Sequence, residues 1–228
     1  MRLVFAAILS VGLLSTFSMA AEKPALTDTK DKESYSLGYQ FGQNMKAQGI
    51  DLDLEIYASG IRDAVNGATP QFTPEEMRNT VTELQKRLAA ARQRERKEMA
   101  DKNLADGSAF LEENEKKEGV VSLPSGLQYK VLAEGSGKTP KATESVTVNY
   151  RGTLTNGTEF DSSFKRGQPA TFEVGKLIRG WSEALQLMKE GAKWRIFIPP
   201  ALAYGDRGTG PIPPNSTLIF DVELVSVN

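Results

Sequence analysis

One long stretch without helix breakers constrains this chain most. Between Thr73 and Gly119 the sequence has Pro74 near the start, no later proline, and Gly107 as the single internal glycine. Thr73 can cap a helix, Pro74 suits the first helical position, and Glu76 completes a capping box. We therefore predict a helix of about 45 residues, roughly 67 Å long at about 1.5 Å per residue. This helix separates an N-terminal part of the chain from a C-terminal part.

The two halves of this predicted helix differ in character. The first half carries apolar residues at alternating steps of four and three, which predicts a seam for packing against the N-terminal part. These residues are Met77, Val81, Leu84, Leu88 and Ala91. Residues 92–98 are polar all round, so we expect the second half to be a solvated, free-standing rod. Acidic residues alternate with basic ones there, and we therefore expect no nucleic-acid binding.

Two shorter helical patterns precede the long one. Residues 22–32 are polar, so we expect disorder there, and a helical pattern begins at Ser34. Gly38 and Gly42 form a smooth stripe on this helix, although each glycine costs a helix interior about 1 kcal/mol. The stripe has two explanations, close packing within one chain or packing between two chains. A second helix spans about Leu54–Val65, and two such helices hold too little apolar surface for a core of their own. That shortage favours dimerisation.

The first twenty residues are typical of a secretory signal. Arg2 provides a positive charge, residues 3–17 form an apolar run, and Ser18-Met19-Ala20 offers small residues before a cleavage site after Ala20. The run is too short to span a membrane. The chain has no cysteine, which excludes a lipid-modified cysteine, a disulfide framework and thiolate metal sites. We therefore expect an exported protein without a membrane span.

The sequence period changes after Gly119, from helical to alternating. Alternation predicts strands with one buried face. The alternating sets are Val146, Val148 and Tyr150; Trp194, Ile196 and Ile198; and Leu218, Phe220, Val222 and Leu224. Between them, Trp181, Leu185 and Met188 indicate one short helix. Strands with a single helix across them predict an α+β module.

Five short blocks between Tyr150 and Phe220 bring five aromatic side chains and one carboxylate into this module. The blocks are 148–152, 159–163, 178–181, 203–205 and 218–222. Their side chains can converge on one concave apolar face. The chain has no histidine and no cysteine, so this face is poor in proton shuttles and nucleophiles. We expect no metal and no cofactor, and the pattern points to catalysis by conformation. The net charge of −1 gives no electrostatic reason to expect a nucleic-acid partner.

The order and spacing of these blocks resemble the FKBP family of peptidyl-prolyl cis-trans isomerases, over roughly Val120–Asn228. Upstream, Ser34–Gly38, Asn44–Ile50 and Leu123–Lys130 resemble the macrophage-infectivity-potentiator type of secreted bacterial FKBP. The resemblance implies an antiparallel sheet wrapped on one short helix, preceded by an all-α dimerisation module and a long linker helix. The expected boundaries are 1–20 for the signal peptide, 21–73 for the dimerisation module, 74–118 for the linker helix and 119–228 for the isomerase domain.

The resemblance also implies roles for individual residues. Trp181 would form the floor for the proline ring, and Asp161 would polarise the twisted amide and orient Tyr150. The Ile178 N–H and the Tyr204 hydroxyl would bind substrate carbonyls. The implied catalytic residues are Tyr150, Asp161 and Tyr204, and the implied substrate-binding residues are Phe160, Leu177, Ile178, Trp181, Ile212 and Phe220. Ala170 stands where many relatives have an aromatic residue, so we expect that side of the pocket to be more open.

The leading hypothesis is thus a homodimeric prolyl isomerase that acts on unfolded or proline-containing polypeptides. It would be periplasmic, outer-membrane-associated or secreted, with chaperone activity and inhibition by rapamycin-type macrolides. One alternative is a non-catalytic holdase that uses the pocket and the dimer cleft only to bind unfolded chains. A second is an adhesion rod, but the sequence shows none of the repeats that such a rod would carry. The complete set of pocket residues favours catalysis.

Overall fold

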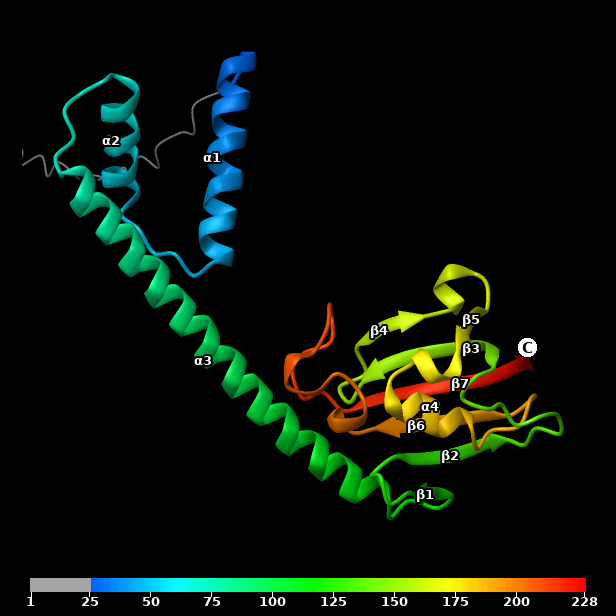
Figure 1. Ribbon diagram of the computed structural model, residues 1–228. Coiled ribbons are helices and arrows are strands. Elements are labelled where there is room, and N and C mark those ends of the chain that lie inside the picture. Colours follow the sequence, from blue (N-terminus) through cyan, green and yellow to red (C-terminus); the bar gives the residue numbers. More distant parts are fainter. Residues whose placement is uncertain (1–25) are drawn as a thin grey trace, which may run out of the picture. The chain divides into compact units, whose positions relative to one another are not determined.

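The computed structural model describes residues 26–228 (Figure 1). The secretory signal predicted from residues 1–20 lies outside the described residues. The chain divides into two compact units, with the boundary between Thr73 and Pro74. The described part of the first unit, residues 26–73, contains two helices, and the second unit contains the long helix together with the sheet domain.

In the first unit, both helices begin at aspartate caps. Helix α1 spans Thr29–Ala47, and the Asp28 side chain accepts a hydrogen bond of 2.7 Å from the Asp31 N–H. Helix α2 spans Leu54–Val65, as predicted, and begins after the N-cap Asp53. Disorder was expected for residues 22–32, and this was wrong for residues 29–32, which are helical. An aspartate cap satisfies the free N–H groups of the first turn, which stabilises a helix start that apolar periodicity does not detect.

The apolar side chains of α1 and α2 are largely exposed within this unit. Phe41 stacks on Tyr57 with ring centroids 4.9 Å apart, and Met45 is the one buried residue of the two helices. The exposed ones include Tyr35, Leu37, Tyr39, Phe41, Leu54, Ile56, Ile61 and Val65. A Cβ atom added at Gly38 or Gly42 would meet nothing within 4 Å. Packing within the described chain therefore gives no reason for this glycine stripe.

The second unit begins with α3, a helix of 41 residues that spans Pro74–Asn114. Its second half is not the free-standing rod that the polar sequence predicts. Asn114 is 2% exposed and donates a 2.9 Å hydrogen bond to Gln128, whose own amide donates to the Leu111 carbonyl. A Cβ atom on Gly107 would lie 2.3 Å from Thr217 Oγ1, so the helix approaches the domain closely there. The packing face combines Gly107 and Asn114 with Phe110, whose ring lies 6.0 Å from that of Phe197, and it has too few apolar positions for hydrophobic periodicity to reveal it.

The remainder of this unit is an antiparallel sheet with α4 across one face (Figure 1). The strands are β1 Val120–Ser122, β2 Gln128–Ala133, β3 Ser145–Leu154, β4 Glu159–Ser162, β5 Ala170–Glu173, β6 Lys193–Ile198 and β7 Leu218–Val227, and α4 spans Arg179–Leu185. The main path of the sheet runs β1-β2-β6-β7-β3-β4, and β5 pairs with β3 beside β4. The predicted α+β class is confirmed.

Alternation along the strands explains which face of the sheet is buried. On β3, Val146, Val148 and Tyr150 are buried, and on β7 so are Leu218 and Phe220. The register pairs these two strands along most of their length. Consequently Tyr150 and Phe220 point to the same face, the one covered by α4, and the two aromatic rings lie 6.4 Å apart.

Candidate active site

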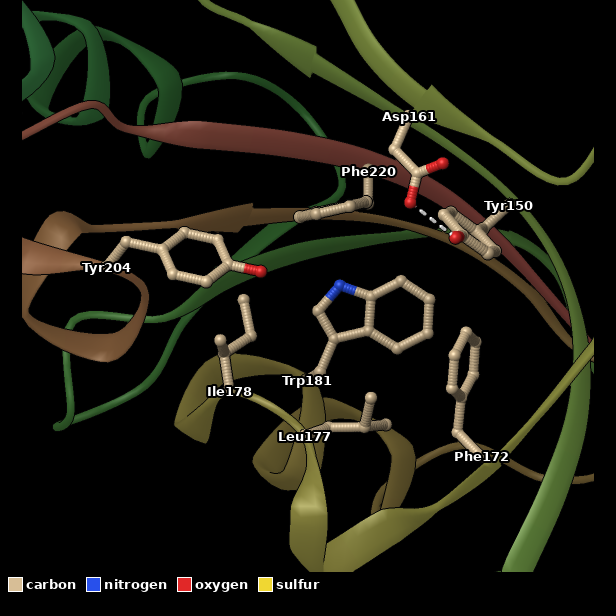
Figure 2. Close-up of a pocket in the computed structure, with 8 residues that line it drawn as sticks. All are labelled: Tyr150, Asp161, Phe172, Leu177, Ile178, Trp181, Tyr204 and Phe220. Atoms are coloured by element: carbon tan, nitrogen blue, oxygen red, sulfur yellow. Dashed lines mark hydrogen bonds between the residues drawn. The ribbon is translucent and has the colours of Figure 1, made fainter. Parts of the chain in front are cut away.

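A pocket of about 140 Å³ opens between the sheet and α4 (Figure 2). Side chains from six separate segments line it. The lining residues are Tyr150 of β3, Asp161 of β4, Phe172 of β5, Leu177, Ile178 and Trp181 at the start of α4, Tyr204 in a loop, and Phe220 of β7. Seven of these eight were predicted from the sequence, and the fold brings them together from positions up to about seventy residues apart.

Trp181 forms the floor of the pocket and is 4% exposed. The ring planes of Tyr150 and Phe220 stand nearly perpendicular to its indole, at interplanar angles of 86° and 87° and centroid distances of 5.4 and 5.1 Å. Such edge-to-face pairs place the positive ring edge against the negative ring face, which is favourable. The neighbouring rings therefore favour one orientation of the indole, and Figure 2 shows the three side chains together.

Phe160 and Ile212 were predicted to contact substrate, but they are not among the residues that line the pocket. Phe160 packs edge-to-face on Phe220 with centroids 5.4 Å apart, so it supports the wall from behind. Gly152 makes this packing possible, because a Cβ atom there would lie 2.6 Å from Phe220 and 2.8 Å from Phe160. Ile212 is 6% exposed and belongs to the hydrophobic core.

A network of three side chains forms the polar rim. The Tyr150 hydroxyl donates to Asp161 Oδ2 at 2.5 Å, the dashed line in Figure 2, and Arg166 Nη1 lies 2.5 Å from Asp161 Oδ1. Arg166 Nη2 also donates to the Tyr150 hydroxyl at 2.6 Å, and its guanidinium lies 5.3 Å from the centre of the Tyr150 ring. The carboxylate therefore has its charge balanced before any substrate arrives.

The network sets the protonation states of the rim. Burial raises the pKa of the Asp161 carboxyl, but the hydrogen bonds from Tyr150 and Arg166 outweigh burial, so its pKa lies below the usual range. Burial and the hydrogen bond to Asp161 raise the pKa of Tyr150. Burial and the charge of Asp161 raise the pKa of Tyr204. Around neutral pH the rim thus holds one carboxylate, one guanidinium and two neutral phenols.

Two hydrogen-bond donors at the pocket have no partner among the described residues. The Tyr204 hydroxyl points into the pocket from the 39% exposed Tyr204 side chain (Figure 2). The Ile178 N–H precedes α4 and donates to no acceptor within residues 26–228. A polypeptide bound over Trp181 could place its carbonyl groups against both donors.

Arg166 and Phe172 were not predicted as site residues. Arg166 reaches Asp161 because the short 3-10 turn Phe164–Arg166 ends at Gly167, whose φ of 72° favours glycine. Phe172 lies two residues after Ala170, on the same face of β5, and lines the side that Ala170 was expected to leave open. The two-residue period of a strand was the available signal for Phe172. Arg166 had no comparable signal in the sequence.

Comparison with known proteins agrees with this geometry. The model for the FKBP-type peptidyl-prolyl cis-trans isomerase matches residues 136–225, and the model for the domain amino terminal to such isomerases matches residues 30–131. The outer membrane protein MIP of Legionella longbeachae is 48% identical over all of this chain and 97% of its own length. The chain belongs to the FKBP-type peptidyl-prolyl cis-trans isomerase family. The peptidyl-prolyl cis-trans isomerase Mip of Coxiella burnetii is 46% identical to this FKBP, over 100% of this chain and 99% of its own.

The FKBP family assignment extends to the architecture. The crystal structure of FkpA from Escherichia coli matches with a TM-score of 0.74 and 37% identity, and the match covers 90% of this chain and 99% of FkpA. Both the N-terminal helices and the isomerase domain therefore belong to a known FKBP arrangement. Over residues 26–228, no helix is both long and apolar enough to cross a membrane. The same residues contain no cluster of three or more carboxylates that could hold a metal ion.

Proposed function

We propose that this FKBP accelerates rotation about X-Pro bonds in the pocket over Trp181. The observation that carries the proposal is the arrangement of the pocket itself. An indole floor is ringed by aromatic edges, and the single carboxylate at the rim is already paired with Arg166 and Tyr150. Such a site can bind and twist an apolar group, but it offers no nucleophile and no proton shuttle.

Rotation about an X-Pro bond is slow because amide resonance creates a barrier of about 18–20 kcal/mol. Resonance is strongest when water hydrogen-bonds the carbonyl oxygen of the planar amide. We propose that the proline ring lies on Trp181. The carbonyl oxygen before the proline is then transferred from water to the ring edges of Tyr150 and Phe220. Losing those water hydrogen bonds destabilises the planar form relative to the twisted one.

Polar groups then act selectively on the twisted amide. Asp161 stands at the rim, where its field can polarise the twisted group and where it fixes the Tyr150 ring. The Ile178 N–H and the Tyr204 hydroxyl hold the flanking substrate carbonyls so that one side of the bond can turn while the other is fixed. A ten-thousandfold acceleration needs only about 5.5 kcal/mol of preferential binding to the transition state. A few such contacts supply that amount.

We further propose that this FKBP is an exported homodimer. The likeness to FkpA and the exposed apolar faces of α1 and α2 support a homodimer built on residues 21–73. The name of the Legionella longbeachae relative, an outer membrane protein, supports export to the cell envelope. The expected partners are proline-containing or unfolded exported polypeptides, and rapamycin-type macrolides should occupy the same pocket. We expect the protein also to bind unfolded chains as a chaperone.

The test is the rate of cis-to-trans conversion of short X-Pro peptides with the mature chain present. We expect acceleration proportional to enzyme concentration, removed by a rapamycin-type macrolide. A non-catalytic holdase would bind an unfolded protein and prevent its aggregation but leave the peptide rate unchanged. Peptide binding without acceleration would therefore overturn the proposal in favour of the holdase.

A further inference from the structure

The loop 205–216 connects the pocket to helix α3. Tyr204, at the start of the loop, lines the pocket, and Ile212, within it, is buried in the core. The loop is folded back on itself, because Thr209 and Ile212 exchange backbone hydrogen bonds and the Asn215 N–H donates to the Gly205 carbonyl at 2.8 Å. These hydrogen bonds join the two arms of the loop, so we expect a shift of its outer end to shift Tyr204 as well.

Helix α3 holds both ends of this loop. Arg96 Nη2 lies 2.7 Å from the Arg207 carbonyl oxygen and 3.5 Å from that of Asp206. About two helical turns later, Asn103 Nδ2 donates to the Pro214 carbonyl at 2.8 Å. Asn215 Nδ2 returns a hydrogen bond of 3.3 Å to the Ala100 carbonyl. All of these partners are more than one hundred residues apart in the chain, so they hold the loop from outside rather than through local turns.

The part of α3 that carries these groups is itself fixed to the sheet domain. Beyond Asn103, Gly107 packs on Thr217, Phe110 lies 6.0 Å from the Phe197 ring, and Asn114 is buried against Gln128. Arg96 and Asn103 therefore project from a helix anchored on the same domain that holds Trp181. Their donor groups have a fixed position relative to the pocket floor.

We propose that Arg96 and Asn103 are positioning residues of the isomerase. They hold the loop 205–216 in the place that sets the Tyr204 hydroxyl over the pocket and Ile212 behind it. This proposal rests on the proposed function, because the loop matters to catalysis only if the pocket isomerises X-Pro bonds. The consequence is that the second half of α3 belongs to the catalytic unit and tunes which residue is accepted before proline.

The experiment compares full-length Arg96→Met with Arg94→Met, a matched control on an exposed residue of the same helix. We expect Arg96→Met to lower kcat/KM on X-Pro peptides about fivefold, the typical loss for one hydrogen bond to a carbonyl, and to reduce the preference among residues before proline. Arg96→Lys retains one charged donor and should recover part of the loss. Asn103→Ala should act in the same direction, and the double variant should lose less than the sum, because both residues hold one loop.

A second readout does not depend on catalysis. The rate of tryptic cleavage between Arg207 and Gly208 reports how firmly the loop is held, and it should rise in Arg96→Met but not in Arg94→Met. The wild-type chain could fail to accelerate X-Pro rotation while Arg96→Met is still cleaved faster than it. That result would support the tether but overturn the proposed function. Unchanged cleavage together with unchanged peptide preference in Arg96→Met would overturn the positioning role. The positioning role would also be overturned if Arg94→Met changed cleavage and peptide preference as much as Arg96→Met does.

Discussion

The Tyr150 hydroxyl donates a hydrogen bond of 2.5 Å to Asp161, and the same hydroxyl accepts one from Arg166. The phenol is thus fixed from both sides, and its ring forms one wall of the pocket. Because the network neutralises the carboxylate, Asp161 can stay at the rim of an apolar pocket without the full cost of an unpaired charge. The wall and the rim are therefore one structural unit.

Asp161→Leu should lower kcat/KM on X-Pro peptides, because it removes the field at the twisted amide and frees the Tyr150 ring. Tyr204→Phe should lower it about tenfold by removing one hydrogen bond to the substrate. Asp221→Leu and Tyr129→Phe are matched controls, since Asp221 pairs with Arg195 away from the pocket and Tyr129 stacks on Trp194. Equal losses in the controls would contradict the assigned roles.

Trp181→Ala should abolish activity and reduce the free energy of unfolding by about 3–5 kcal/mol, because a large buried aromatic side chain is lost. Urea denaturation together with peptide kinetics measures both effects. Trp194→Ala is the matched comparison, because Trp194 is 6% exposed and lies outside the pocket. It should be destabilised to a similar degree yet remain active per folded molecule. Activity retained in Trp181→Ala would show that the indole is not the floor for the substrate.

Activity should change little between about pH 5 and pH 9. Because the pKa of Asp161 is lowered, its carboxylate contributes to the free energy of unfolding above its unfolded-state pKa of about 3.9. This contribution is lost as pH falls through the lower folded-state pKa. Because the pKa of Tyr150 is raised, its neutral phenol contributes to the free energy of unfolding below its unfolded-state pKa of about 10. This contribution is lost as pH rises through the higher folded-state pKa. The chain has no histidine to titrate between these limits. A bell-shaped profile centred near neutral pH would indicate proton transfer and contradict the mechanism.

Gly38→Leu combined with Gly42→Leu should convert the proposed homodimer to monomers. Neither leucine would clash within the described chain, where a Cβ atom at each position meets nothing within 4 Å. In an interface between helices, however, the added volume would force the two chains apart. Light scattering measures the mass, and Gln40→Leu, which changes an exposed residue on the other face of α1, should leave the dimer intact. If the doubly substituted protein remained a dimer, its interface would not lie at Gly38 and Gly42.

A fragment that begins at Pro74 should isomerise short peptides as well as the full chain does, because it keeps α3 and every contact of the loop 205–216. A fragment that begins at Val120 loses Asn114 and exposes Gln128, so it should be less stable and less active. Proline-limited refolding of a protein should slow in both fragments. Two linked pockets can hold one client at two points and raise its effective concentration, which neither fragment can do. Equal refolding activity in the full chain and in the Pro74 fragment would remove client holding as the purpose of dimerisation.

Sequence reasoning predicted the elements whose signals are local and apolar. The bounds of α2, the alternation that buries Val148 and Tyr150, and the convergence of Trp181 with Phe220 all follow from periodicity and block order. Arg166 was missed because its ion pair with Asp161 depends on how one turn places a long side chain. The docking face of α3 was missed because Asn103 and Gly107 carry little hydrophobic signal, and its contacts come from sequence positions about one hundred residues away.

The close contact between Gly107 and Thr217 fixes the rotational phase of α3. An unbroken helix advances about 100° and about 1.5 Å with each residue. Inserting a single residue between Pro74 and Arg96 would leave the docking face and the pocket unchanged, but it would swing the first turn of the helix by more than a quarter of a circle. The number of residues before Arg96 therefore sets the direction in which the helix start faces. Length variation in this segment is expected to come in steps of seven or eleven residues, which restore that direction nearly in full.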